Sequence, residues 1–111
     1  MKLGLIVYTD DTETVSNAFQ FAIYAREAGD QVEVFLLGKG VGASLGKTGG
    51  YARNVYSVAQ QMKTLVDSGG RILVSGQCLE FRELGVPDLC TRADVKAMHE
   101  MVKSSDRVIT F

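Results

Sequence analysis

The stretch Leu3-Gly4-Leu5-Ile6-Val7-Tyr8 is short and almost continuously apolar. Such a run is typical of a strand that is buried on both faces of a parallel sheet. Behind it, Asp10 and Glu13 resemble a capping box, which predicts the start of a helix. The apolar residues that follow recur at helical spacing: Val15, Ala18, Phe19, Ala22 and Ile23. Gly29 is expected to end this helix in a left-handed conformation.

The same order of strand and helix continues along the rest of the chain. Further strands are predicted over 32–37, 71–74 and 108–111, and residues 79–91 are expected to be irregular or a short helix. Two more apolar stripes predict helices between these strands: Val55, Val58, Ala59, Met62, Leu65 and Val66, then Val95, Met98 and Val102. Strands that alternate with helices favour parallel strands joined by right-handed crossovers. We therefore expect a single α/β domain over 1–111, a three-layer sandwich whose mostly parallel sheet has four to five strands and helices on both faces.

The composition excludes several classes of function. The chain has 111 residues, of which 12 are Lys or Arg and 13 are Asp or Glu, so its net charge is 12 − 13 = −1. This balance, without a dense basic cluster, argues against a nucleic acid or a membrane surface as a partner. The first apolar stretch is too short for a signal peptide. We therefore expect a cytoplasmic protein, in which Cys78 and Cys90 are free thiols.

Three segments are predicted to meet at one edge of the sheet. The segments 9–13, 38–50 and 75–82 each follow a predicted strand, and ligands of parallel sheets bind outside the carboxyl ends of the strands. Asp10 lies in the first of these segments, where it can cap the helix or face a ligand. Any chemistry is therefore expected at this edge.

The glycine-rich stretch 38–50 partly matches three known motifs, none of them completely. Gly46-Lys47-Thr48 resembles the end of a P-loop, but Val41 stands where its first glycine is required. Gly38, Gly40 and Ala43 fit a dinucleotide fingerprint, but this follows the second strand rather than the first, and we expect no helix to begin at once. Gly42-Ala43-Ser44-Leu45-Gly46 spells a nucleophile elbow, although glycines continue on both sides of it. A surface loop explains all three.

Cys78 is the residue that points most clearly to chemistry. It lies just beyond a predicted buried strand and follows Gly76 and Gln77, where glycine allows the backbone to bend. If a helical turn starts at residue 79, its free N–H groups would favour the thiolate and lower the pKa of Cys78, and Arg82 would add positive charge. The alternative is a small buried hydrophobic residue, which is how many free cysteines behave.

Here the sequence resembles the DsrE/DsrF/TusD-type sulfur-relay family over essentially its whole length. The resemblance rests on Cys78 after a strand and Gly76, on Asn17, and on two longer segments. These segments are Val34-Phe35-Leu36-Leu37-Gly38-Lys39-Gly40-Val41 and Ser105-Asp106-Arg107-Val108-Ile109-Thr110-Phe111. It implies a parallel-sheet α/β fold, oligomers, and sulfur carried as a persulfide on Cys78.

This resemblance predicts a sulfur carrier or sulfurtransferase that uses no metal and no organic cofactor. Cys78 would take sulfane sulfur from a donor and pass it to an acceptor, each a protein or a small thiol. Backbone N–H groups near Cys78 and the glycine stretch, including Gly40, would stabilise the anionic persulfide. Many relatives read Cys-Gly-x-Cys where this chain has Ser75, so a resolving thiol next to Cys78 is missing.

Two further expectations concern the partners of this chain. The alternative to a sulfur carrier is a non-catalytic module that binds a small ligand or partner through residues 38–50. Cys90 could receive sulfur from Cys78 if its loop folds back, but a structural thiol is the simpler interpretation. We also expect a homo-oligomer, with Tyr51, Tyr56, Phe81 and the exposed flank of the third helix as candidates for the interface.

Overall fold

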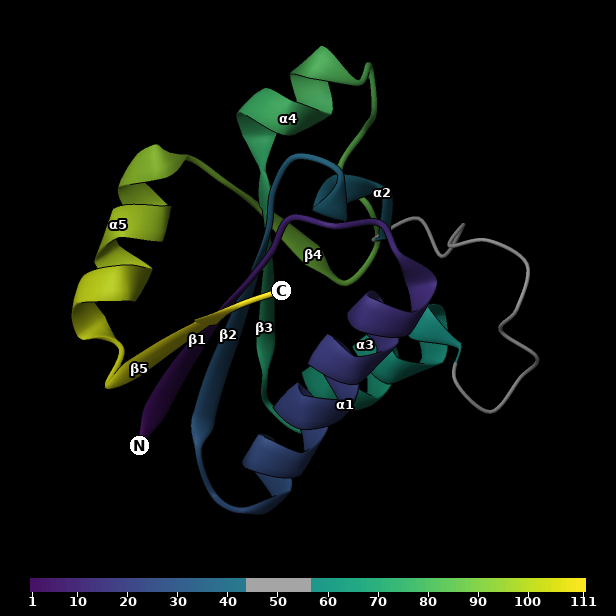
Figure 1. Ribbon diagram of the computed structural model, residues 1–111. Coiled ribbons are helices and arrows are strands. Elements are labelled where there is room, and N and C mark those ends of the chain that lie inside the picture. The colour runs from purple at the N-terminus through teal and green to yellow at the C-terminus, as the bar shows by residue number, and fades with distance from the viewer. Residues whose placement is uncertain (44–56) are drawn as a thin grey trace.

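The computed structural model describes residues 1–43 and 57–111. Five parallel strands form one sheet in the order β4-β3-β2-β1-β5, with helices on both of its faces (Figure 1). The predicted α/β class and the layered sandwich are therefore confirmed. The strands are β1 (Lys2–Val7), β2 (Gln31–Leu36), β3 (Arg71–Ser75), β4 (Cys90–Ala93) and β5 (Arg107–Thr110), and the helices are α1 (Thr12–Glu27), α2 (Gly40–Ala43), α3 (Val58–Asp67), α4 (Gly76–Phe81) and α5 (Val95–Ser104).

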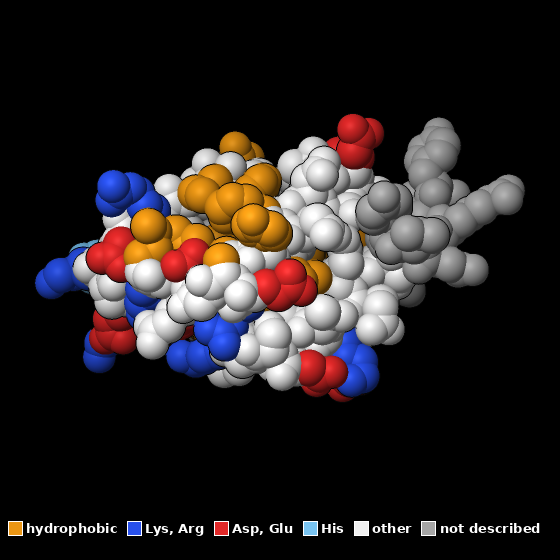
Figure 2. Space-filling view, turned by 90° about the horizontal axis from the view of Figure 1, so that it is seen from below, with side chains coloured by type: hydrophobic (Ala, Val, Ile, Leu, Met, Phe, Trp, Pro, Cys, Tyr) orange, Lys and Arg blue, Asp and Glu red, His pale blue; other side chains and the backbone are white. Residues whose placement is uncertain are grey.

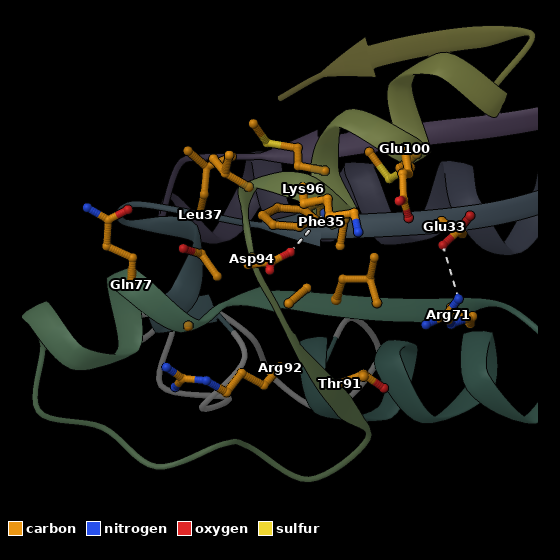
Figure 3. A pocket seen from close by; sticks show the side chains of 18 of the residues that line it. Glu33, Phe35, Leu37, Arg71, Gln77, Thr91, Arg92, Asp94, Lys96 and Glu100 are labelled. Carbon is orange, nitrogen blue, oxygen red and sulfur yellow. Dashed lines mark hydrogen bonds and ion pairs between the residues drawn. The ribbon is translucent and has the colours of Figure 1, made fainter.

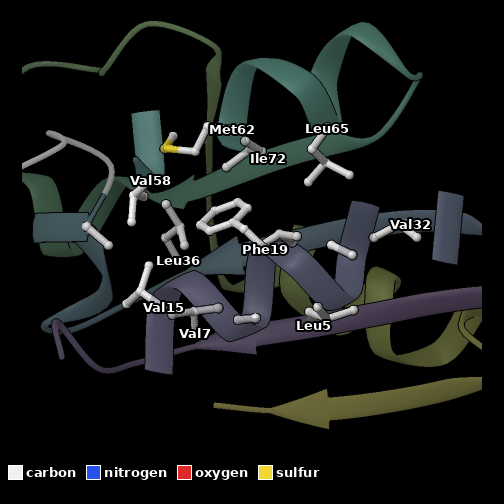
Figure 4. Close-up of a cluster of buried hydrophobic side chains, with 14 of the residues drawn as sticks. Leu5, Val7, Val15, Phe19, Val32, Leu36, Val58, Met62, Leu65 and Ile72 are labelled. Carbon is white, nitrogen blue, oxygen red and sulfur yellow. The ribbon is translucent and has the colours of Figure 1, made fainter. Parts of the chain in front are cut away.

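The main core lies between the sheet and the pair α1 and α3. The apolar run of β1 contributes Leu3, Leu5 and Val7 to it, and Phe19 of α1 is only 1% exposed at its centre (Figure 4). Met62 and Leu65 of α3, which lies beside α1 on the same face of the sheet, complete this core. The helical stripes that the sequence predicts for α1 and α3 thus form the interior of the protein.

A smaller core lies on the opposite face, under α5. It consists of Phe35 and Leu73 from the sheet, Ala93 from β4 and Met101 from α5. Gly4 permits this close packing, because a Cβ atom there would lie 2.9 Å from the Ser105 Oγ and 3.3 Å from the Met101 Cε. The predicted stripe of α5 is only partly right, since Val95 is 72% exposed and Met101 is the residue that is buried.

Capping residues fix the ends of the first helix. Asp11, rather than the predicted Asp10, caps α1, and its carboxylate accepts the Thr14 N–H at 3.0 Å. This bond and the Thr14 hydroxyl hold the pKa of Asp11 below its usual value. The capping box is therefore wrong by one position, and Glu13 lies in the first turn without that role. Gly29 follows the helix with φ +96°, the left-handed conformation that the sequence predicts.

The region between β3 and α5 differs most from the sequence prediction. The sequence predicts an irregular segment or a short helix over residues 79–91, but α4 begins earlier, at Gly76, and an additional strand, β4, begins at Cys90. This strand pairs with β3 in the register Ile72↔Cys90 to Ser75↔Ala93. It escapes detection because Cys90-Thr91-Arg92-Ala93 has no apolar run, and its two middle residues are exposed.

Candidate functional site

The carboxyl ends of β1, β2 and β3 meet at one edge, as the sequence predicts. Asp10 is exposed after β1, Gly38 follows β2, and Ser75 and Gly76 lead directly from β3 into α4. Cys78 thus lies in the first turn of α4 rather than before it. The Ser75 hydroxyl accepts the Cys78 N–H at 3.2 Å, so Ser75 caps the helix that carries Cys78.

The Cys78 thiol is held by the turn that follows β2. Its Sγ accepts the backbone N–H of Gly38 at 3.2 Å, and the side chain is partly buried against the main core. Gly38 has φ +56°, a conformation that glycine adopts without strain. The turn therefore places a backbone donor directly against the sulfur, and such a donor favours negative charge on that atom.

Gly40 positions this turn. A Cβ atom at residue 40 would lie 2.1 Å from the Val7 carbonyl oxygen, so only glycine lets α2 pack on the end of β1. The sequence assigns Gly40 to a flexible loop, and the structure corrects this, because a short helix begins at that residue. The remainder of the glycine stretch, with Ser44 and Lys47, lies outside the described residues, as do Tyr51 and Tyr56.

Gly76 is also explained by close packing rather than by a bend. A Cβ atom there would lie 2.6 Å from the Arg92 guanidinium carbon, and the φ of Gly76 is not positive. Arg92 in turn forms an ion pair with Glu80 of α4 at 2.7 Å. The glycine thus allows a cation from β4 to approach the helix that carries Cys78.

A groove of about 1080 Å³ extends from Cys78 along the α5 face of the sheet. Phe35, Leu73 and Ala93 form its apolar floor (Figure 3). Thr91 and Arg92 line it from β4, and Lys96 and Glu100 line it from α5. Among the described helices, α5 is the one that packs on this face of the sheet, whereas α1 and α3 share the other face (Figure 1).

The charges of the groove differ between its two ends. At the amino end of the strands, Glu33 pairs with Lys2 at 2.8 Å and with Arg71 at 3.4 Å. At the Cys78 end, Arg92 is paired with Glu80, whereas Lys96 forms no ion pair with any described residue. The groove therefore offers a cation, Lys96, that is available to an anionic ligand.

The predicted site residues come together only in part. Cys78, Gly76 and Gln77 line the groove, whereas Arg82 is exposed at the end of α4 and is absent from the lining. Sequence reasoning assigned the nearby positive charge to Arg82 and missed Arg92 and Lys96. The position of Arg92 depends on β4, whose polar sequence gives no strand signal, and the position of Lys96 depends on the packing of α5.

Cys90 lies at the far end of the β3–β4 pair from Cys78. It aligns with Ile72, while Cys78 follows Ser75, so about three strand steps, or roughly 10 Å, separate the two positions along the strand. A disulfide requires Cα atoms within about 7 Å. Both cysteines are free, and the geometry favours the structural interpretation of Cys90 over a resolving role.

Burial, and after it the charge of Asp88, raises the pKa of Cys90 to about 11. The folded protein therefore keeps this proton to a higher pH than the unfolded chain does, and stability is expected to fall as the pH rises from about 9 to about 11. Denaturant unfolding across this range, compared with Cys90→Ala, measures the effect. If the free energy of unfolding fell equally with pH in the two proteins, this expectation would be contradicted, because the alanine variant lacks the titrating group.

The part of the chain that the structure describes contains neither a helix long and apolar enough to cross a membrane nor a group of three His, Cys, Asp or Glu side chains placed to hold a metal. Its site is thus a single cysteine at the carboxyl edge of a parallel sheet, beside a backbone donor and an open groove. The architecture defines a small α/β protein with a thiol at the position where such sheets bind ligands.

The chain belongs to the DsrE/DsrF-like family, whose model matches residues 1–111. It is 30% identical over 102 residues to the uncharacterized protein MK0008 of Methanopyrus kandleri, covering 89% of this chain and 83% of that protein. It is 32% identical over 102 residues to the uncharacterized protein MJ0989 of Methanocaldococcus jannaschii, covering 89% and 88%.

Two solved structures share the fold. The YchN protein of E. coli superposes with a TM-score of 0.80 at 23% identity over 100% of both chains. BT1422 of Bacteroides thetaiotaomicron, a conserved protein of unknown function, superposes with a TM-score of 0.78 at 19% identity over 99% of this chain and 94% of its own. At these identities the likeness extends to the five-stranded parallel architecture.

Proposed function

We propose that this protein carries sulfane sulfur as a persulfide on Cys78, within an intracellular sulfur relay. The observation that carries the proposal is the position of the Cys78 Sγ, which accepts the Gly38 N–H at 3.2 Å and borders the groove. Membership of the DsrE/DsrF-like family, which is generally linked to sulfur relay, supports the same assignment.

The chemistry is an exchange at sulfur. The Cys78 thiolate attacks the outer sulfur of a donor persulfide, the S–S bond of the donor breaks, and the donor leaves as a thiolate. An acceptor thiolate then attacks the outer sulfur of the Cys78 persulfide, and Cys78 leaves as its thiolate. Each transfer conserves the oxidation state, so no external oxidant or reductant is required. The Gly38 N–H stabilises the anionic sulfur at Cys78 in both directions.

The groove supports a donor or acceptor that reaches the thiol from the α5 face. Its volume of about 1080 Å³ suits a small thiol or a segment of a protein partner, since small-molecule sites span roughly 300–1000 Å³. Lys96 supplies a cation for an anionic group on such a partner. Because both cysteines are free, we propose that the protein works in the reducing cytoplasm.

Intact mass spectrometry after brief exposure of the reduced protein to inorganic polysulfide tests this function. We expect the wild type and Cys90→Ser to gain one sulfur atom and Cys78→Ser to gain none. The Cys90 variant is the matched control, because its thiol is half-buried on the same protein. Equal sulfur loading of Cys78→Ser and the wild type would refute the proposal.

The alternative of a ligand-binding module that uses residues 38–50 gains no support from the described residues. Gly38 and Gly40 have positional roles in this structure, one as a donor to Cys78 and the other in packing against Val7. The rest of that stretch lies outside residues 1–43 and 57–111.

A further inference from the structure

Two charged side chains in the groove have no ionic partner. Lys96 and Glu100 both line it from α5, and neither forms an ion pair with another residue that the structure describes. They lie four residues apart, so their side chains leave the same face of the helix with Cβ atoms about 6 Å apart. Figure 3 shows Lys96 on the side of Asp94 and Glu100 on the side of Glu33. The groove thus presents a cation and an anion one helical turn apart.

The stability of α5 does not explain this arrangement. Lys96 lies in the first turn, where the helix dipole favours an anion and disfavours a cation. Glu100 follows Lys96 along the chain, and a glutamate placed after a lysine at this spacing forms the weaker of the two possible pairs. Asp94 accepts the Ala97 N–H at 2.9 Å and is occupied as the helix cap. The charges of Lys96 and Glu100 therefore remain available to a ligand.

These two charges have a fixed order relative to the thiol. β3 and β4 are parallel, and Ser75 pairs with Ala93 at their carboxyl ends. α4 begins directly after Ser75 and carries Cys78, whereas α5 begins shortly after Ala93 and runs back toward the amino ends of the strands. From its carboxyl end inward, the groove therefore presents the Cys78 thiol, then the Lys96 ammonium and then the Glu100 carboxylate.

The rest of the groove offers no further unpaired charge among the described residues. At the amino ends of the strands, the Glu33 side chain is only 14% exposed and is paired with both Lys2 and Arg71. The floor residues Phe35 and Leu73 lie on strands that are paired on both sides, so their backbone has no donors for an extended peptide. The unpaired charges span about 6 Å along α5. That length suits an amino-acid group, an ammonium and a carboxylate on one carbon, better than a segment of a protein.

The surface around α5 also carries charges of both signs. Figure 2 shows Lys or Arg and Asp or Glu side chains intermingled at the α5 end of the molecule, opposite the residues drawn in grey. The whole chain has a net charge of −1. Such a surface attracts neither anions nor cations as a class. Recognition therefore depends on the local pair of Lys96 and Glu100, which favours a ligand that carries both charges.

We propose that the groove binds a low-molecular-weight persulfide whose thiol carries an amino-acid group, with its carboxylate at Lys96 and its ammonium at Glu100. This inference rests on the proposed function of Cys78 and specifies its sulfur donor. The Cys78 thiolate attacks the outer sulfur of the bound R–S–SH, the S–S bond breaks, and R–S⁻ leaves, so that Cys78 becomes the persulfide. No oxidant or reductant takes part. The apolar floor faces the carbon atoms that join the amino-acid group to the sulfur.

Binding is tested without sulfur transfer, because S-methylcysteine has the amino-acid group but no free thiol. Its methyl ester lacks the carboxylate, and its N-acetyl derivative lacks the ammonium. We expect calorimetry with the wild type to show that S-methylcysteine binds at least about threefold more tightly than either derivative. The amide NMR signals of residues 94–100 should shift during the titration. Equal affinities for the three compounds, or shifts confined to other residues, would overturn the proposal.

Two substitutions assign each charge to its partner. Lys96→Gln should remove the difference in affinity between S-methylcysteine and its ester, and Glu100→Gln the difference between S-methylcysteine and its N-acetyl derivative. Both side chains are exposed, so the variants should fold like the wild type. Lys103→Gln is the matched control, since it removes a charge from the same helix outside the groove and should preserve both differences. Differences that persist in Lys96→Gln and Glu100→Gln would contradict the assignment.

Sulfur transfer separates this inference from the proposed function. The persulfides of cysteine and of glutathione both carry an amino-acid group, and that of 2-mercaptoethanol carries none. We expect at least one of the first two to load the wild type about threefold faster, an advantage that Lys96→Gln and Glu100→Gln remove. The faster of the two identifies the length of thiol that fits the groove.

Inorganic polysulfide provides the reference donor, because it has no amino-acid group to bind. If polysulfide loads Cys78 while the three organic persulfides react equally, the inference fails and the sulfur-carrier function stands. If neither polysulfide nor any of the persulfides loads Cys78, the proposed function fails, and the assignment of its donor fails with it.

Discussion

Gly40→Ala is expected to lower the free energy of unfolding by about 3 kcal/mol. The added Cβ would lie 2.1 Å from the Val7 carbonyl oxygen, and this atom belongs to the backbone of the central sheet. A flexible side chain could move away, whereas β1 is held by strands on both sides. The chain must instead displace α2 and the turn at Gly38, and this turn donates the hydrogen bond to Cys78.

Gly42→Ala is the matched control for this substitution. Gly42 lies in the same short helix, and a Cβ atom there meets no described atom within 4 Å. Because alanine favours helix by about 1 kcal/mol over glycine, we expect a neutral or slightly stabilising change. Urea unfolding of both variants gives the comparison, and equal midpoints would show that the contact with Val7 does not restrict residue 40.

Leu79→Ala is expected to destabilise the protein by about 2–5 kcal/mol and to loosen the site as well. Leu79 is fully buried and is the one large side chain that attaches α4 to the main core. A helix of six residues is too short to be stable without such packing. The neighbouring Cys78 should therefore lose its fixed position beside Gly38 and react faster with an alkylating reagent.

Phe81→Ala provides the control on the same helix. Its side chain is 81% exposed, so its removal should change stability by less than about 0.5 kcal/mol and leave the alkylation rate of Cys78 unchanged. The two variants are compared by thermal unfolding and by the rate of labelling in the folded protein. If Leu79→Ala labels Cys78 at the wild-type rate, the position of the thiol does not depend on this anchor.

The sequence predicts the central architecture because its signals there are strong. The apolar runs of β1, β2 and β3 are buried on both faces, and the stripes of α1 and α3 match the helical period. The edge strand β4 has no comparable signal, since its exposed residues Thr91 and Arg92 have no core to pack against. Edge strands follow from pairing with a neighbour rather than from their own composition.

The candidate site also combines one feature that the sequence predicts with others that depend on tertiary packing. The position of Cys78 could be predicted, because the carboxyl ends of parallel strands converge at one edge. The cations around the groove could not, since Arg92 depends on the pairing of β4 and Lys96 on the packing of α5. The helix cap was misplaced by one residue because Asp10 and Asp11 are chemically equivalent candidates in the sequence.

The place of β1 between β2 and β5 also determines the order in which the sheet can be assembled. β1 pairs with β2 after one short crossover, but its contact with the β5 region joins residues 104 positions apart, as between Lys2 and Asp106. Contacts at such separation form slowly, because closing a long loop costs entropy before any contact is gained. During synthesis, the edge of β1 that pairs with β5 therefore stays unpaired until residue 107 has left the ribosome. A chaperone that binds extended apolar segments would meet it in that interval.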